Sequence, residues 1–423
     1  MKPEDILNAI GSPKSLEILY REDPSAFERL FPEIFRNNPN SPILQVWHER
    51  LFYDAKEEQD FVSCDTKEKS KAIVVTIGLS LIAGTLIKLP DFIAAMNDEL
   101  YFTRNTGFIV IMALAAYFLI VKINRKCDIC VVVLPALIGL LFINLLPDRS
   151  DSQTITLSYL HMPFFVWSLL GLSYLGGSWR NLQHCMEFIR YNGELVVYTT
   201  IILMGGTVLT VITMALFELI NVRIENWYMK YVVLYGTVAS PIVGTLIIDN
   251  MVGKRFKIAP LLARIFTPLF LVTVIAYLVA MIIRQKSPYT DREFLITFNG
   301  LLLIVLSLSI LAIAERNTKG RVGISDIMNI GLVAGTLIID MVALSAILFR
   351  LSSYGFTPNR VAVLGANVIV FCHLAGILYF YIRVMKENSR IIMLENWIAR
   401  YIPIYTAWSI IVAFGFPIAF WFK

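Results

Sequence analysis

The stretch IMNIGLVAGTLIIDMVALSAILF, residues 327–349, decides the fold class of this chain. It is 23 residues long, and Asp340 is its one charged residue. At a rise of about 1.5 Å per residue, a helix of this length crosses the roughly 30 Å hydrocarbon layer of a bilayer. Backbone groups find no water partners in lipid, so such a segment crosses as a helix. The stretch is therefore predicted to be a transmembrane helix.

The rest of the chain has the same character. Of its 423 residues, 57% are hydrophobic and 16% are charged, and the mean hydropathy is +0.66. Soluble globular chains carry about 45–50% apolar and about 25% charged residues, so the composition excludes that class. We predict an all-α fold, a polytopic helical membrane bundle of about eleven transmembrane helices. The predicted spans are 72–93, 107–121, 129–146, 156–176, 195–222, 231–250, 260–283, 294–314, 327–349, 361–382 and 402–422.

Residues 1–70 are far more polar and are predicted to form a separate small helical unit, with residues 71–423 as the transmembrane domain. Ser12, Asp23 and Ser41 each precede a proline, and a capping side chain before proline is typical of a helix start. After the second of these starts, apolar residues recur on one helical face: Phe27, Leu30, Phe31, Ile34 and Phe35. A lone core of this size is marginal, so we expect the unit to pack on the membrane domain or to bind a cytoplasmic protein partner.

The loop charges predict the orientation. No signal-peptide pattern precedes the first predicted span, which favours a cytoplasmic N-terminus. With that choice, the loops predicted inside carry more Lys and Arg than those outside, as the positive-inside rule requires. An odd number of spans then leaves the C-terminus outside.

A short string recurs in the apolar sequence. Gly-Thr-Leu-Ile-Ile-Asp occurs at 244–249 and 335–340, and a shorter copy, Gly-Thr-Leu-Ile, occurs at 84–87. A small residue lies four positions before each glycine, a spacing that lets helix backbones approach closely in lipid. The first and sixth predicted spans share the string in opposite orientation, which also fits an inverted repeat, although the spans that follow them show no such similarity. The residues predicted to pack helices are Gly84, Gly244, Gly331 and Gly335.

The two acids that end the long copies differ in predicted depth. Asp249 falls at the cytoplasmic end of its span, where it is expected to act as an interfacial anchor or to pair with Arg264. Asp340 falls near mid-span, where an aspartate costs about 2.5–3.5 kcal/mol. On the next span Asn367 and His373 bracket it, at depths of about 9 and 18 Å against about 13 Å. Asp340, His373 and Asn367 form the predicted intramembrane polar site, either a proton-responsive Asp340–His373 pair or a structural hydrogen bond between helices.

The sequence offers little for catalysis. The Cys-x-x-Cys of Cys127 and Cys130 has no second ligand pair, so we predict no metal site, and no motif predicts a catalytic residue or a cofactor. No aromatic-basic patch suggests nucleic-acid binding, and the expected non-protein partner is membrane lipid. One loop fits an interfacial enzyme acting on lipid-linked substrates, and fits an ordinary amphipathic helix equally well. Its polar residues are Arg180, His184, Glu187 and Arg190.

Three segments carry a family resemblance. They are HMPFFVWSLLGLSYLGG from His161, RYNGELVVYTTIILMGGTVLT from Arg190 and YGFTPNRVAVLGANVIVF from Tyr354. Over about residues 159–383 the chain resembles an uncharacterised family of bacterial multi-pass membrane proteins, catalogued as a domain of unknown function. The resemblance implies a bacterial inner-membrane location and implies no reaction or substrate.

Three functions fit these observations. A permease-like or ion-coupled transporter of a small solute predicts a polar cavity that reaches Asp340. A non-transporting scaffold or sensor predicts a closely packed bundle around Asp340, with residues 1–70 binding a cytoplasmic partner. A membrane-embedded enzyme, the least favoured, predicts that the residues of the Arg180–Arg190 loop gather at one interface.

Overall fold

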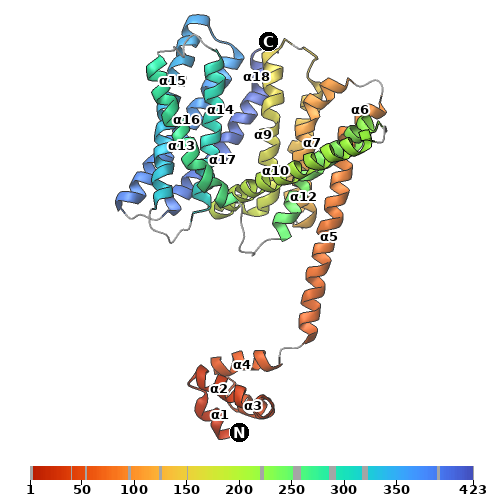
Figure 1. Cartoon of the computed structure of the whole chain (residues 1–423), viewed down its shortest axis with the longest axis vertical. Coiled ribbons are helices and arrows are strands. Elements are labelled where there is room, and N and C mark those ends of the chain that lie inside the picture. Colours follow the sequence, from red (N-terminus) through yellow and green to blue (C-terminus); the bar gives the residue numbers. More distant parts are fainter. Residues whose placement is uncertain are drawn as a thin grey trace. The chain divides into compact units, whose positions relative to one another are not determined.

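The computed structural model describes residues 3–39, 41–52, 55–93, 97–122, 126–149, 151–219, 223–250, 259–284, 292–316, 323–387 and 391–422. All regular structure within these ranges is helical, which confirms the predicted all-α class. The chain divides into two compact units, Met1–Lys71 and Ala72–Lys423. Figure 1 shows the helices of both, and each unit is described here by itself.

The first unit is built from α1 (Pro3–Ala9), α2 (Pro13–Glu22), α3 (Pro24–Asn37), α4 (Pro42–Phe52) and the first part of α5 (Ala55–Ile87). The Ser12 and Asp23 side chains cap α2 and α3 by accepting hydrogen bonds from the backbone amides of Ser15 and Ala26. Both prolines that follow the caps occupy the first turn, as the sequence predicts. The side chains of the core come from α1 to α4 and include Ile6, Leu16, Phe27, Phe31, Leu44 and Trp47.

One carboxylate joins α2 to α4. Glu17 accepts hydrogen bonds from Arg50 Nη1 at 2.6 Å and from Arg21 Nε at 2.8 Å. The hydrogen bond from Arg50, followed by that from Arg21, lowers the pKa of Glu17 below its ordinary value. Because the pKa is lower in the folded than in the unfolded unit, the pair stabilises the fold above the unfolded pKa. That contribution is lost as the pH falls through the folded pKa.

We therefore expect acid to reduce the protection of the first unit against hydrogen exchange more in the wild-type chain than in a Glu17→Gln variant. The measurement is exchange mass spectrometry of peptides from α2 and α4 at neutral pH and near pH 3, corrected for the intrinsic pH dependence of exchange. Glu17→Gln should be less protected than wild type at neutral pH and should respond less to acid. An equal loss of protection in both proteins would show that the pair contributes nothing.

The second unit contains the predicted spans. The helices that follow α5 are α6 (Leu89–Phe92), α7 (Asp98–Val121), α8 (Lys126–Leu145), α9 (Gln153–Leu175), α10 (Leu182–Leu219), α11 (Glu225–Tyr228), α12 (Leu234–Asn250), α13 (Ala259–Arg284), α14 (Arg292–Ala314), α15 (Ile324–Tyr354), α16 (Pro358–Glu387), α17 (Ile392–Ile410) and α18 (Phe416–Ala419). Within the described ranges, nine helical stretches are long and apolar enough to cross a membrane, and α13 and α14 hold shorter apolar stretches. The chain is therefore a multi-pass membrane protein.

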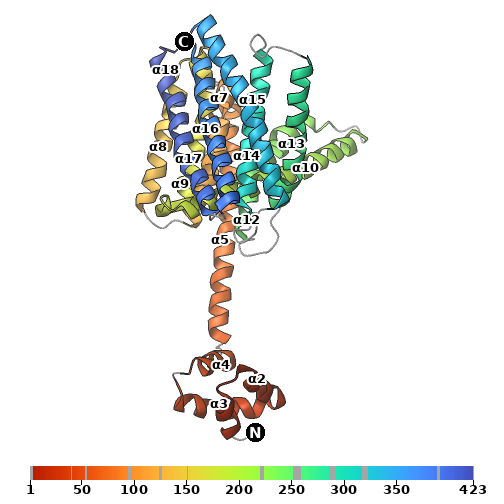
Figure 2. The same cartoon turned by 90° about the vertical axis from the view of Figure 1, so that its left-hand side faces the viewer.

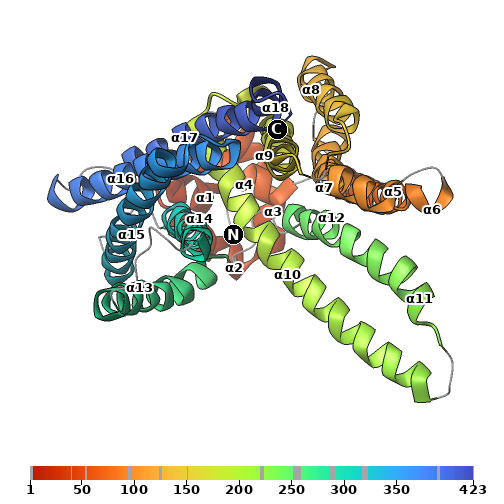
Figure 3. The ribbon, with the colours of Figure 1, turned by 90° about the horizontal axis from the view of Figure 1, so that it is seen from above.

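The helices of this unit pack as two groups. Figures 2 and 3 show α13 to α16 standing together, with α17 and α9 linking them to α7, α8 and the end of α5. One buried cluster joins α10, α14, α15, α16 and α17 around Leu306, Leu337 and Leu374. A second joins α5, α7, α9, α10 and α12 around Phe118 and Tyr191. Helix α10 contributes buried side chains to both clusters.

Helix α10 differs from its neighbours in length and direction. At about 1.5 Å per residue, its 38 residues measure about 57 Å. In Figure 1 it runs obliquely past the upright α9 and α14. Much of its surface is exposed and apolar, including Val196, Met204, Val208 and Val211. An oblique course lets a helix longer than the bilayer thickness stay in contact with lipid.

Two helices contain a π-helical turn, Met229–Val233 before α12 and Ile411–Gly415 after α17. Such turns are rare and leave backbone groups off the α-helical ladder. In the second turn, Ser158 of α9 donates its hydroxyl to the Ala413 carbonyl at 2.6 Å. A side chain of a neighbouring helix thus satisfies this carbonyl inside the bundle.

The predicted packing glycines lie at helix contacts. A Cβ added to Gly84 would come within 2.5 Å of Tyr235 on α12, and one added to Gly335 within 2.8 Å of Val274 on α13. At Gly244 and Gly331 the nearest side-chain atoms would be 3.4 Å away. Side chains at the first two positions would have to displace a neighbour, so these glycines set the separation of α5 from α12 and of α15 from α13.

Two further glycines, which the sequence analysis missed, have even closer neighbours. Gly365 and Gly376 on α16 lie against the indole rings of Trp408 and Trp397 on α17. Both pairs are separated by eleven residues, three helical turns, along each helix. Because the two helices are antiparallel, Gly365 meets the later tryptophan, Trp408, and Gly376 meets the earlier one, Trp397.

Candidate functional site

One face of α15 carries a row of buried polar residues. Asp326, Asn329, Thr336 and Asp340 are all at most 8% exposed. Their spacings of three, seven and four residues keep them on one side of an α-helix. We call this row, with the side chains of α14 and α16 that meet it, the polar seam. Of these four residues, the sequence predicts only Asp340 as part of a site, although the helical spacing of the other three can be seen in it.

An ion pair lies at the first end of the polar seam. Arg316, just after α14, places Nε 2.9 Å from Asp326 Oδ1, and both side chains are 10% exposed. The other oxygen of Asp326 accepts the Gly323 amide at 2.8 Å and so caps the start of α15. The pair thus fastens the beginning of α15 to the end of α14. In the predicted orientation, this is the cytoplasmic end.

The next polar layer lies about one turn further along. Asn329 Oδ1 accepts a hydrogen bond from Ser309 of α14 at 2.9 Å. Its Nδ2 donates to the hydroxyl of Tyr381 of α16 at 3.2 Å. All three residues are at most 1% exposed. Because Asn329 reaches both neighbours, this face of α15 looks into the junction between α14 and α16.

Asp340 faces the same junction, deeper in the bundle. It is eleven residues beyond Asn329, which is three turns plus about 20° of rotation and about 16 Å along the axis. Its exposed fraction is 0%, and neither carboxylate oxygen has a hydrogen-bond partner among the described residues. Thr336, one turn before it, is equally buried, and its hydroxyl also has none there. An ionised carboxylate in such surroundings costs several kcal/mol unless something compensates its charge.

Asn367 lies at the depth of Asp340 and pairs with a residue that the sequence analysis did not consider. Its Nδ2 donates to Asn299 Oδ1 of α14 at 2.9 Å. Asn299 is ten residues from Ser309, about 15 Å, and Asn367 is fourteen from Tyr381, about 21 Å. Since Asp340 is about 16 Å from Asn329, the amide pair and the carboxyl group lie within about one turn of each other in depth.

His373 does not join Asp340 in this structure. Its Nδ1 shares a hydrogen bond of 2.8 Å with the Tyr405 hydroxyl, and its ring stacks on Tyr401 with centroids 4.1 Å apart. Both tyrosines belong to α17. The face of α16 that meets α14 and α15 carries Leu374 and Tyr381, and His373 is turned about 100° away from Leu374. The predicted Asp340–His373 hydrogen bond is therefore not formed here.

Asp249 lies in a different polar cluster. It accepts a hydrogen bond from the Tyr117 hydroxyl at 2.9 Å and forms an ion pair with Lys122 at 2.5 Å. Arg264, the expected partner, is exposed. Lys122 is 127 residues before Asp249, so the local sequence gave no sign of the pair. With a partly exposed ion pair and a tyrosine beside it, Asp249 holds α12 to α7.

The polar residues between Arg180 and Arg190 that were considered for catalysis lie in different surroundings. Glu187 is exposed, and Arg180 lies over the Trp179 ring at 4.6 Å. Arg190 points into the bundle, where it donates to the Ala314 carbonyl at 2.6 Å and to Glu395 at 3.1 Å. It thus caps the C-terminus of α14 and joins α10 to α17. In the part of the chain that the structure describes, no three His, Cys, Asp or Glu side chains form a group that could hold a metal ion.

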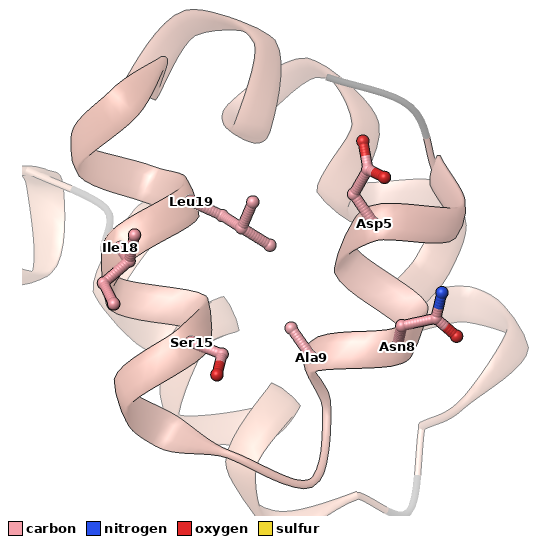
Figure 4. Close-up of a pocket in the computed structure, with 6 residues that line it drawn as sticks. All are labelled: Asp5, Asn8, Ala9, Ser15, Ile18 and Leu19. Atoms are coloured by element: carbon pink, nitrogen blue, oxygen red, sulfur yellow. The ribbon is translucent and has the colours of Figure 1, made fainter.

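The first unit carries a separate surface groove. Figure 4 shows it between α1 and α2, with Leu19 and Ala9 facing each other and Asp5 and Asn8 at one side. Its volume is about 430 Å³, and Ile18 at its edge is 48% exposed. The groove is shallow, and its lining combines the apolar side chains of α1 and α2 with the polar side chains of Asp5, Asn8 and Ser15.

Comparison of the chain with protein-family models, with curated proteins and with solved structures finds no match in any of the three.

Proposed function

We propose that the chain is an ion-coupled membrane transporter of a small solute, in which Asp340 binds the coupling ion. The observation that carries this proposal is a carboxyl group next to the midpoint of α15, fully buried, with neither oxygen hydrogen-bonded among the described residues. Ionisable groups in this position are expensive and commonly mark the path of an ion or proton. The family resemblance supports a bacterial inner-membrane location for this transporter, and the loop charges favour a cytoplasmic N-terminus.

The polar seam supports a mechanism of this type. A bound cation or proton neutralises Asp340, so the loaded site can be enclosed by apolar helices at little electrostatic cost. The empty, ionised site requires water or another partner and favours a conformation that opens. The Arg316–Asp326 pair and the Asn329 layer separate Asp340 from one end of the bundle. Breaking these contacts would open a polar route of about 21 Å from Asp326 to Asp340.

The proposal predicts that Asp340→Asn abolishes ion-coupled flux without unfolding the protein. Wild type and variant are reconstituted in liposomes that contain a pH-sensitive or Na⁺-sensitive dye. Ion uptake is recorded under an imposed gradient while a panel of amino acids, sugars and organic acids is added. We expect solute-dependent uptake with wild type and none with Asp340→Asn. Equal uptake by both proteins would exclude Asp340 as the coupling site.

The second candidate function is a scaffold or sensor, and two observations favour it. Asp340 is enclosed by the bundle with no exposed surface, as that reading predicts, whereas the transporter requires a second conformation in which a polar cavity reaches Asp340. The first unit also presents the α1–α2 groove, where a cytoplasmic protein could dock (Figure 4). If wild-type liposomes show no ion movement under any gradient or solute, the scaffold reading replaces the transporter.

A further inference from the structure

We propose that Asp340, Thr336 and the Asn299–Asn367 pair form a binding site for a monovalent metal cation of the size of Na⁺. This inference rests on the proposed function, because it names the coupling ion of the same site. It is argued from oxygen atoms that the three helices α14, α15 and α16 bring within about two helical turns of one another in depth.

Three buried side-chain oxygens of α15 lack hydrogen-bond partners among the residues that the structure describes. Thr336 Oγ1 and both oxygens of Asp340 are buried and have no hydrogen-bond partner within the described ranges. Residues four apart on a helix have Cβ atoms about 5–6 Å apart, so a single ion can reach both side chains. Buried polar atoms without partners are rare in folded proteins, and a bound ion or water is one of the ordinary explanations for a group of them. Three such atoms on adjacent turns of one helix indicate one shared ligand.

The helical positions of Thr336 and Asp340 give the direction in which these oxygens point. Asn329 contacts α14 and α16 at once, and Thr336 and Asp340 follow it by seven and eleven residues. At about 100° per residue, both lie within about 20° of the direction of Asn329. They are therefore aimed at the junction where Asn299 of α14 meets Asn367 of α16. The amide oxygens of that pair lie at about the same depth and can complete the oxygen set.

The charge of the site and its ligand types indicate which ion would bind. Carboxylate, amide and hydroxyl oxygens are the ligands that hard metal cations prefer. Asp340 is the one charged residue of α15 between Asp326 and Arg350, so its carboxylate gives this stretch a charge of −1. A monovalent cation makes the buried site neutral, whereas a divalent one would leave an uncompensated charge at low dielectric. A proton would also neutralise the carboxyl group and would let it hydrogen-bond to Thr336, so the binding measurement with ²²Na⁺ must distinguish the two ions.

The test is direct binding of Na⁺ to the purified full-length chain in lipid nanodiscs. Binding of ²²Na⁺ is measured with choline chloride holding the ionic strength constant, and the thermal midpoint is followed in parallel as NaCl replaces choline chloride. We expect saturable binding and a rise in the thermal midpoint with NaCl. Asp340→Asn should abolish both, and Thr336→Val and Asn367→Leu should each weaken binding by about tenfold or more, as for loss of one contact to a charged group.

The matched control is Thr199→Val, which removes another buried hydroxyl without a partner in the described structure, at the contact of α10 with Gly244. It should bind Na⁺ as wild type does, and size-exclusion chromatography shows that each variant is folded. Wild type that responds equally to NaCl and choline chloride, or binding that survives Asp340→Asn, would overturn the cation site. Proton-driven flux that depends on Asp340 would then still support the transporter. Conversely, Na⁺ binding at Asp340 without any flux would support the site and exclude transport.

Discussion

Replacing Gly376 with alanine is expected to destabilise the membrane unit by about 1–3 kcal/mol or more, because the new methyl group would overlap the Trp397 indole. The ring cannot move aside freely. Its Nε1 donates to the His373 carbonyl at 3.2 Å, and it packs on Tyr401 with centroids 5.0 Å apart. The strain must therefore separate α16 from α17 or break this hydrogen bond. A lower midpoint of thermal or SDS-induced unfolding would report the loss.

The matched control for this prediction is Gly206→Ala. A Cβ at Gly206 of α10 would meet nothing within 4 Å, and alanine is intrinsically better in a helix by about 1 kcal/mol. This variant should be as stable as wild type or more so. Shrinking the ring in the double variant Gly376→Ala/Trp397→Leu should recover part of the loss. If Gly376→Ala matches Gly206→Ala, the close approach of the two helices at this point is not required.

Replacing Asp326 with alanine is expected to cost about 3–5 kcal/mol, the usual effect of removing one member of a buried ion pair. Two contacts are lost together: the 2.9 Å pair with Arg316 and the 2.8 Å bond from the Gly323 amide that caps α15. Both charged side chains are 10% exposed, so water compensates the loss poorly. The unfolding midpoint of the purified protein measures the effect.

Two further variants distinguish the stability that Asp326 contributes as a helix cap from the stability that its charge contributes. Asp326→Asn keeps an oxygen that can accept the Gly323 amide and loses the charge, so it should be less destabilising than Asp326→Ala. Asp98→Ala removes an acid from the first turn of α7 that is exposed, and it should change stability by less than about 0.5 kcal/mol. If Asp326→Ala behaves like Asp98→Ala, the ion pair does not hold α15 to α14.

The helical spans and the depth of Asp340 could be predicted because both follow from counting residues along one helix. An apolar segment of about 20 residues has the length of a transmembrane helix. The mid-helix position of Asp340 depends only on the ends of α15. Helix α5 ends at Ile87 instead of residue 93, and α7 begins at Asp98 instead of residue 107, because a helix can continue through polar residues that hydropathy leaves outside a span.

The partners could not be predicted, because they depend on how each helix is rotated about its axis. His373 and Leu374 are adjacent, yet one meets α17 and the other meets α14 and α15. Asn367 finds Asn299, 68 residues earlier, and Arg190 finds Glu395, 205 residues later. The equal spacing of Gly365 and Gly376 with Trp397 and Trp408 was a usable signal for one such contact.

The oblique course of α10 has a consequence for the surrounding lipid. The candidate membrane-spanning stretch of α10, Leu182–Met214, is about 50 Å long, and a straight helix of that length sweeps sideways by about 40 Å when it crosses a hydrocarbon layer of about 30 Å. Thicker membranes would draw it upright and thinner ones would lay it flatter, each at a modest cost per ångström. The acyl-chain length of the surrounding lipid should therefore change the tilt of α10 in the membrane.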